Sequence, residues 1–215
     1  MKLYDYYRSS CSYRVRIALN LKQISYEQST VHLINQGGEQ HQNAYLELNP
    51  QGLVPTLDDH GHRLNQSLAI IEYLDEINPH PALLPQNPLQ RAEVRRIAMM
   101  IACDMHPLNN LRVLEQLRTQ FQATEEQILV WYHHWLKKGF DAIEKTLANL
   151  ERKIDVCFGD KVTLADICLI PQVYNAKRFD FSLESYPQIC KINDYCLTIS
   201  AFINASPESY VNEVK

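Results

Sequence analysis

The chain has 215 residues, of which 46% are hydrophobic and 21% are charged, as is ordinary for a globular protein with a substantial core. The formal net charge of −4 gives no reason to expect nucleic acid or an anionic membrane as a partner. No apolar run approaches the ~20 residues that span a bilayer, and the N-terminus lacks the apolar stretch of a secretory signal. We therefore expect a cytoplasmic protein.

The first 78 residues alternate between strand and helix signals. Strands are predicted at 2–7, 25–31, 54–57 and 62–64, and helical segments at 44–48 and after Ser9 and Gln66. Asp58-Asp59-His60-Gly61 is typical of a hairpin turn between the last two strands. This order of elements predicts a small sheet with helices packed on it.

The second part of the chain has a different pattern of residues, with a proline-rich stretch followed by helical segments. Pro79, Pro81, Pro85 and Pro88 exclude a helix interior and predict a linker that runs over the surface. Helical patterns then cover residues 90–117, 124–150, 164–179 and 187–199, which predicts an all-helical second half. Residues 204–215 are polar, and we expect them to form a surface tail.

The six cysteines favour neither disulfides nor a metal site. They are Cys11, Cys103, Cys157, Cys168, Cys190 and Cys196. None is spaced as Cys-x-x-Cys, and a chain of this size does not need disulfide staples. Most lie in apolar helical patterns, where a buried, inert thiol is expected. The eight histidines include no His-Glu-x-x-His pair, so no metal site is predicted.

The segment Arg8-Ser9-Ser10-Cys11 connects the first predicted strand to the first predicted helix. Its hydroxyls and thiol lie at a helix start, where backbone N–H groups and the positive end of the dipole favour an anion. Cys11 has no resolving partner because position 14 is arginine, which excludes dithiol exchange. Two interpretations stay open here. Cys11 is a nucleophile of lowered pKa, or Ser9 or Ser10 hydrogen-bonds a thiolate that a ligand supplies.

Two further motifs have both a structural and a functional interpretation. Val54-Pro55 is either an ordinary trans proline at a strand start, or a cis peptide that turns the Val54 main chain outward to pair with an extended peptide. Ser67, after Gln66, is either a helix cap or the holder of a ligand carboxylate. The run from Thr163 to Asp166 is a variant capping box, for which a structural role is expected.

Taken together, these pieces resemble the cytosolic glutathione transferase family, and within it the zeta class. The zeta signature Ser-Ser-Cys-x-x-Arg-Val-Arg is matched by residues 9–16, with Tyr13 where tryptophan is commoner. That departure should affect packing more than catalysis. Further matches cover nearly the whole chain: Asn49-Pro50, Val54-Pro55-Thr56-Leu57, 66–74, Leu83-Leu84-Pro85, 106–114, Ala165-Asp166 and 171–179. The form of residues 106–111 resembles the bacterial branch of the class.

The resemblance implies the glutathione transferase fold, an α/β domain followed by an all-α domain. A thioredoxin-like glutathione-binding domain with a mixed four-stranded sheet would span 1–82, a linker 83–89 and an all-helical domain 90–215, and the chain would form a homodimer. Glutathione would be the cofactor. By analogy, Ser9, Gln40, Val54, Gln66, Ser67, His106 and Asn110 would bind it, Ser9, Ser10 and Cys11 would be the catalytic residues around its sulfur, and Arg8, Arg112 and Arg178 would bind an acidic substrate.

The implied reaction is the cis–trans isomerisation of maleylacetoacetate to fumarylacetoacetate in tyrosine and phenylalanine catabolism, by thiolate addition, bond rotation and elimination. Maleylpyruvate isomerisation and a Cys11-dependent glutathione thiol transfer are alternatives. A non-catalytic interaction module is a third, against which the joint presence of Ser9, Gln66 and Ser67 argues. Beside this resemblance, the lack of Cys-x-x-Cys chemistry favours a thiolate supplied by the ligand, with Ser9 as its hydrogen-bond donor.

Overall fold

The computed structural model describes residues 1–210 and divides the chain into two compact units. The first, here called the sheet unit, contains Met1–Leu83 and the segment that begins at Thr198. The second, the helical unit, contains Leu84–Leu197. The sheet unit is built from β1 (Lys2–Asp5), α1 (Ser10–Leu21), β2 (Glu27–Thr30), η1 (Asn35–Gly37), η2 (Glu39–His41), α2 (Asn43–Leu46), β3 (Thr56–Asp59), β4 (His62–Asn65), α3 (Ser67–Ile77), α9 (Ser200–Ile203) and α10 (Pro207–Tyr210).

The predicted mixed four-stranded sheet is confirmed, with the strand order β2-β1-β3-β4. β1 pairs with β2 in parallel and with β3 antiparallel, and β3 pairs antiparallel with β4. Leu3 and Leu57 are register partners and fully buried. His60 and Gly61 form the predicted hairpin turn, and both have positive φ, as a two-residue turn that matches the strand twist requires.

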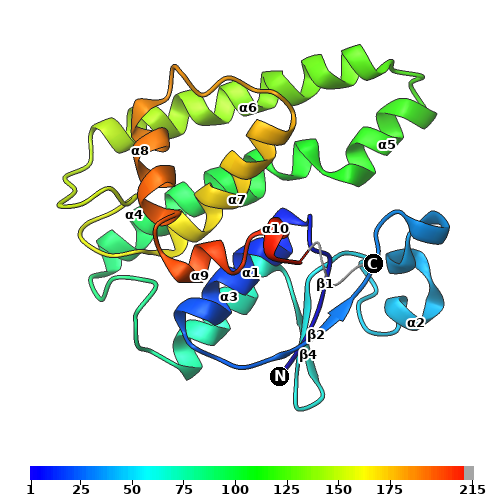
Figure 1. The fold of residues 1–215 in the computed structure, drawn as a ribbon, viewed down its shortest axis with the longest axis horizontal. Helices are drawn as coiled ribbons and strands as arrows, with labels where there is room; N and C mark the ends of the chain where they lie inside the picture. The colour runs from blue at the N-terminus through cyan, green and yellow to red at the C-terminus, as the bar shows by residue number, and fades with distance from the viewer. Residues whose placement is uncertain (211–215) are drawn as a thin grey trace. The chain divides into compact units, whose positions relative to one another are not determined.

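α1 and α3 pack against each other and contribute the helical residues of the core of the sheet unit (Figure 1). Val15, Ala18 and Leu19 are fully buried on α1, as their i, i+3, i+4 spacing predicts. Lys22 is the C-cap of α1, and its buried ammonium group donates to Asp75 Oδ1 at 2.6 Å at the end of α3. This contact connects the C-terminal ends of the two helices.

The prediction of a surface tail from residue 204 is wrong for its first part. Ala205 and Pro207 are buried, and the chain from Thr198 belongs to the sheet unit rather than to the helical one in which the sequence places it. Figure 1 shows α9 and α10 beside α1. Tyr13 is buried, and its hydroxyl donates to the Phe202 carbonyl at 3.2 Å, which joins α1 to α9. The rest of the predicted tail, 211–215, lies outside the described residues.

The prediction of one helix over residues 90–117 is also wrong. α4 (Pro88–Met99) continues as a π-helical stretch, η3 (Met100–Met105), followed by a 3-10 turn, η4 (Pro107–Asn109), and a separate α5 (Leu111–Thr119). Pro107 has no N–H to donate and its ring clashes with a preceding helical turn, so the helix ends although the apolar pattern continues. π-helical turns are frequent at functional sites, and this one leads directly to His106.

The remaining helices of the helical unit are α6 (Glu125–Ala148), α7 (Leu164–Arg178) and α8 (Pro187–Cys196). α6 contacts η3 and α8, and α7 contacts α4 and α8. The buried face of α6 repeats at helical spacing: Ile128, Tyr132, Leu136, Phe140, Ile143 and Leu147. Gly139 faces Met105, and a Cβ at this glycine would overlap the methionine side chain. α6 and η3 therefore approach closely at this point.

The predicted capping box of α7 is confirmed, and because it is buried we expect its removal to lower the free energy of unfolding. The Asp166 carboxylate is fully buried and accepts from the N–H groups of Cys157 (2.6 Å) and Thr163 (2.7 Å) and from the Thr163 hydroxyl (2.9 Å). Asp166→Ala would leave these donors buried without acceptors, so we expect a loss of roughly 2–5 kcal/mol in the free energy of unfolding. Chemical denaturation measures it.

Thr124→Ala is the matched control. It removes the exposed capping box of α6, in which Thr124 Oγ1 accepts from the Gln127 N–H at 3.3 Å. Water replaces that bond, so the expected cost is about 1 kcal/mol. Equal losses in the two variants would show that burial of the α7 box adds nothing.

Candidate active site

Ser9 immediately precedes α1, and its hydroxyl proton is not used in a hydrogen bond to any described residue. Its Oγ accepts from the backbone N–H of Ser12 at 3.2 Å, which makes it the N-cap of the helix. A hydroxyl has one proton and two lone pairs, and in the described part of the chain the Ser9 hydroxyl donates to no residue. The helix start therefore presents an O–H donor and the positive end of the dipole at the same point, as an anion requires.

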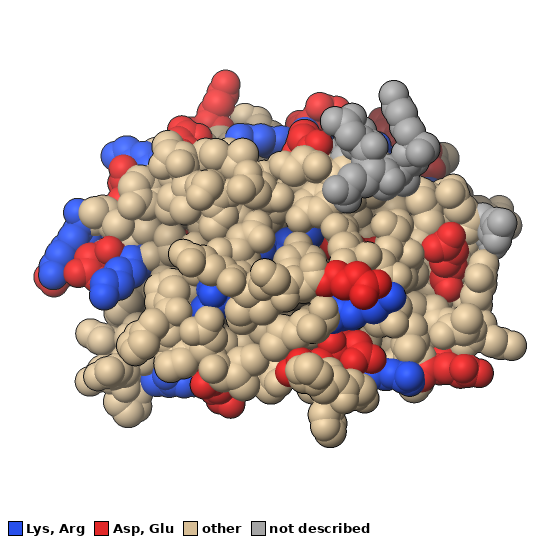
Figure 2. All heavy atoms as spheres, turned by 60° about the horizontal axis from the view of Figure 1, so that its bottom comes forward, with Lys and Arg blue, Asp and Glu red and all other residues tan. Residues whose placement is uncertain are grey.

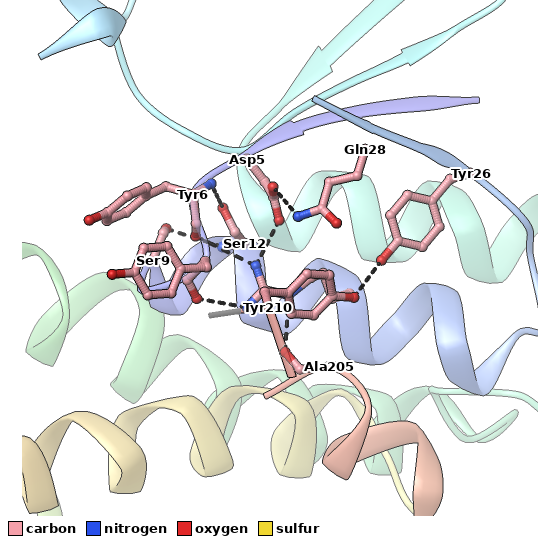
Figure 3. A network of polar contacts seen from close by, with 10 residues as sticks. Asp5, Tyr6, Ser9, Ser12, Tyr26, Gln28, Ala205 and Tyr210 are labelled. Atoms are coloured by element: carbon pink, nitrogen blue, oxygen red, sulfur yellow. Dashed lines mark hydrogen bonds and ion pairs between the residues drawn. The ribbon is translucent and has the colours of Figure 1, made fainter. Parts of the chain in front are cut away.

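The loop in front of Ser9 accepts a hydrogen bond from Arg16, and the Arg16 partners Asp5 and Ala205 are labelled in Figure 3. The guanidinium group of Arg16 is fully buried and donates to Asp5 Oδ2 at 2.7 Å and to the Tyr7 carbonyl at 2.9 Å. Its Nε donates to the Ala205 carbonyl at 3.0 Å. The ring of Tyr210 lies 4.7 Å from the Arg16 Cζ. The C-terminal segment thus completes a network that ends two residues before Ser9.

A second buried arginine joins α1 to α3. Arg14 Nη1 lies 3.3 Å from Ser67 Oγ and 3.8 Å from Cys11 Sγ. Ser10 and Ser67 are buried, while Cys11 is half-buried. The structure therefore brings together Cys11 and Ser67, two predicted site residues that are far apart in the sequence. Arg14 was missed by the sequence analysis, because its pattern does not distinguish a buried arginine from an exposed one.

Gln66 precedes α3 in an unusual backbone conformation. Its φ is +69°, in the left-handed region. This conformation costs a residue with a Cβ about 1–3 kcal/mol, and residues that adopt it occur most often at active sites and ligand sites. Its Nε2 donates to Gln51 Oε1 at 2.8 Å. Gln51 is a second candidate residue that the sequence analysis missed. The only signal for it is the turn after Asn49, whose Oδ1 accepts from the Gln51 N–H at 3.1 Å.

The peptide between Val54 and Pro55 is cis, so the interpretation as an ordinary trans proline is wrong, while the pairing of the Val54 main chain with a ligand stays a prediction. In the described residues, the Val54 N–H and C=O form no hydrogen bond with another residue, so the main chain there retains its donor and acceptor. Gln40 is buried on η2, and its Nε2 donates to the Leu33 carbonyl at 3.3 Å while its Oε1 has no partner among the described groups. Both residues offer polar groups to a peptide-like ligand.

The helical unit holds the other predicted site residues. His106 and Asn110 flank η4, with His106 Nε2 and Asn110 Nδ2 at 3.5 Å. The Asn110 side chain also caps α5 by accepting from the Arg112 N–H at 3.2 Å. Arg178 lies at the end of α7, where its Nη1 donates to Asn175 Oδ1 at 3.1 Å. His106, Asn110 and Arg112 are thus close together, and Arg178 lies on another helix.

Three arginines are available for acidic ligands. Arg8, Arg112 and Arg178 are exposed, and none forms an ion pair with a carboxylate of the described residues. Figure 2 shows acidic and basic side chains mixed on the face that it draws, without a continuous basic patch.

Among the helices in the described part of the chain, none has the length and apolar character needed to cross a membrane.

Comparisons with known proteins identify the family of this chain. A family model described as "Glutathione S-transferase, N-terminal domain" matches residues 3–82. The chain is 49% identical over 208 residues to maleylacetoacetate isomerase of Pseudomonas aeruginosa, and the match covers 96% of each chain. The chain therefore belongs to the glutathione S-transferase family.

Similar solved structures indicate the class to which the chain belongs within this family. A holo structure of maleyl pyruvate isomerase, described as a bacterial glutathione S-transferase in the zeta class, matches with a TM-score of 0.94 at 46% identity, over 97% of this chain and 98% of that one. A maleylacetoacetate isomerase from Methylobacterium extorquens AM1 with bound malonate and GSH matches with a TM-score of 0.92 at 38% identity, over 96% of each chain. Within its family, the chain groups with the zeta class.

Proposed function

We propose that this chain is a glutathione-dependent cis–trans isomerase that converts maleylacetoacetate to fumarylacetoacetate. The observation that carries the proposal is the Ser9 hydroxyl at the start of α1, whose oxygen accepts from the Ser12 N–H while its proton is donated to no described residue and is available for an anion. The names of the relatives, maleylacetoacetate isomerase and maleyl pyruvate isomerase, support the same reaction class. Glutathione supplies a thiol that adds to the cis double bond and leaves again after the bond has rotated.

The task of Ser9 is to stabilise the thiolate form of that thiol. A cysteine thiol has a pKa near 8.5, and lowering it by two units requires about 2.7 kcal/mol of preferential thiolate stabilisation. A helix terminus contributes ~0.3–1 kcal/mol, whereas a hydrogen bond to a charged group contributes ~1.5–3 kcal/mol. The dipole of α1 is therefore too weak alone, and the hydroxyl of Ser9 makes up the difference.

The peptide part of glutathione would be held by the rest of the sheet unit. The main chain of Val54 pairs with it as an added strand would, because its N–H and C=O have no other partner in the described residues. Ser67, at the first position of α3, holds the carboxylate of the γ-glutamyl end together with Gln66. The unpartnered Gln40 Oε1 accepts from an amide of the ligand. These groups fit a ligand with a carboxylate, amides and a thiol.

The substrate carries carboxylates, and the arginines without ion-pair partners suit them. Arg8, Arg112 and Arg178 bind carboxylates and stabilise the enolate that addition creates, since a guanidinium group donates two parallel hydrogen bonds. His106 and Asn110 contribute polar contacts to the cofactor. We further propose a homodimer that works in the cytoplasm, on the strength of the family resemblance.

An assay with two substrates tests the proposed function. Maleylacetoacetate and maleylpyruvate should each be offered with and without glutathione, and the loss of the cis isomer followed. We expect glutathione-dependent turnover, faster on maleylacetoacetate. Faster turnover of maleylpyruvate would assign the chain to that substrate, while no turnover of either would refute the isomerase.

A Cys11-dependent thiol transfer is the second candidate function, because Arg14 Nη1 approaches the Cys11 Sγ and would favour its thiolate. Under our proposal Cys11→Ala retains isomerase activity within about tenfold, since the loss of one weak contact near the sulfur costs ~1 kcal/mol. Steady-state kinetics of both reactions measure it. If Cys11→Ala abolishes isomerisation while Ser9→Ala does not, Cys11 is the nucleophile and our assignment is wrong.

A further inference from the structure

Two arginines on α1 are equally buried but differ in their partners. Arg16 is 0% exposed, and its guanidinium group has the Asp5 carboxylate and backbone carbonyls as acceptors. Arg14 is 1% exposed, and its Nε and Nη2 have no hydrogen-bond partner in the described chain. Nor does any carboxylate of residues 1–210 form an ion pair with Arg14. A buried charge without a counter-ion is costly, which indicates that an anion from outside the chain completes the site.

The contact between Arg14 and Ser67 has a fixed direction. A guanidinium group can only donate, so Ser67 Oγ accepts from Arg14 Nη1 across their 3.3 Å separation. The one proton of the Ser67 hydroxyl is then left for another acceptor, and its donor strength rises because the oxygen is already polarised. Ser67 is the first residue of α3, so this proton lies where the helix dipole also favours an anion.

We propose that Arg14 is a positioning residue that acts through Ser67. It keeps the Ser67 hydroxyl oriented as a donor and supplies the buried counter-charge for the α-carboxylate at the γ-glutamyl end of bound glutathione. The inference rests on the proposed function, because it takes glutathione as the ligand. Through its contact with Cys11 Sγ, the same guanidinium group also lies beneath the sulfur-binding end. One cation therefore links both ends of the ligand site from inside the sheet unit.

Binding measured by calorimetry tests the proposal without relying on turnover. The probes are glutathione and an analogue whose γ-glutamyl α-carboxylate is replaced by an amide. The unmodified chain should bind the analogue at least about tenfold more weakly than glutathione. Arg14→Met should bind glutathione about tenfold more weakly than the unmodified chain and hardly distinguish the two probes. Arg14→Lys, which keeps the charge, should recover part of the discrimination.

Arg63→Met is the matched control for a change in net charge. Arg63 is an exposed arginine of β4 in the same unit, and its Nη1 donates to the Glu47 carbonyl at 2.9 Å. Its substitution should leave the affinity for both probes unchanged. Undiminished discrimination in Arg14→Met would overturn the proposal, as would an equal loss in Arg63→Met.

Thermal unfolding without ligand gives a second, independent readout. Arg14→Met removes an uncompensated buried charge, so its unfolding midpoint should equal or exceed that of the unmodified chain. Arg16→Met breaks the buried pair with Asp5, so its midpoint should fall. An Arg14→Met variant that fails to fold would also contradict the proposal, because the guanidinium group would then be satisfied within the unliganded chain.

These outcomes separate this inference from the proposed function. If the unmodified chain neither binds glutathione nor isomerises either cis substrate, the proposed function fails. If it does both, and Arg14→Met binds glutathione as tightly as the unmodified chain, only the role of Arg14 is refuted.

Discussion

Ser9→Ala is expected to lower kcat/KM for the isomerisation by about 10- to 150-fold. The variant removes a hydrogen bond to the thiolate, and such a bond to a charged group is worth ~1.5–3 kcal/mol. The same energy raises the pKa of the bound glutathione thiol by about 1–2. The pH–rate profile should therefore move in the alkaline direction by that amount, and part of the lost activity should return at high pH. Thiolate absorbance of the complex, followed against pH, measures the pKa directly.

Ser9→Thr is the control, because it keeps both the oxygen that caps α1 and the proton that is donated. It should retain most of the activity. Ser9→Ala also loses the cap formed with the Ser12 N–H, at a cost of about 1 kcal/mol in the free energy of unfolding. A general loss of structure would lower activity equally at every pH. A profile that falls without moving would thus show that Ser9 acts only as a cap.

Asp5→Ala is expected to lower the free energy of unfolding by about 3–5 kcal/mol. Asp5 and Arg16 have side chains with 0% exposure and an N–O distance of 2.7 Å, and removing one member leaves the other charge buried without its counter-ion. Gln28 also loses its acceptor, since its Nε2 donates to Asp5 Oδ1 at 2.9 Å. For a chain of this size, such a loss corresponds to a fall of roughly 10 °C in the midpoint of thermal unfolding.

Glu27→Ala is the matched control on the neighbouring strand. Glu27 pairs with Lys2 of β1 at the same 2.7 Å, but the two side chains are 68% and 35% exposed. An exposed pair contributes ~0–1 kcal/mol, so this variant should be close to the unmodified chain. Similar losses in Asp5→Ala and Glu27→Ala would show that the network around Arg16 contributes no more than a surface pair.

The part of the site that could be predicted from the sequence is local. Ser9 at the start of a helix and Ser67 at the start of another follow from apolar periodicity and cap residues, which report on a few neighbouring positions. The cis state of Val54-Pro55 was one of two alternatives, because the sequence does not contain the packing that selects it. The roles of Ser9 and Cys11 in catalysis are proposals that the variants above test.

What could not be predicted depends on contacts between distant segments. Arg14 and Arg16 lie two positions apart in the same helix, and the sequence does not distinguish their surroundings. Arg16 is paired with Asp5, whereas Arg14 has no carboxylate partner among the described residues. The wrong prediction of one helix over 90–117 has a different, local cause, because the missing N–H of Pro107 interrupts the helix although the apolar pattern continues. The residues after 204 looked polar, but Ala205 contributes its carbonyl rather than its side chain, which composition does not reveal.

The Arg16–Ala205 contact also constrains how the protein is made. The sheet unit is discontinuous: its strands and active-site loop come from the first third of the chain, but the acceptor for Arg16 Nε comes from residue 205 of 215. Synthesis proceeds from the N-terminus, so the early residues leave the ribosome long before this acceptor exists. The loop before Ser9 therefore acquires its full set of hydrogen bonds only after Ala205 has left the ribosome, and ribosome-bound chains that stop before Ala205 are expected to bind glutathione poorly.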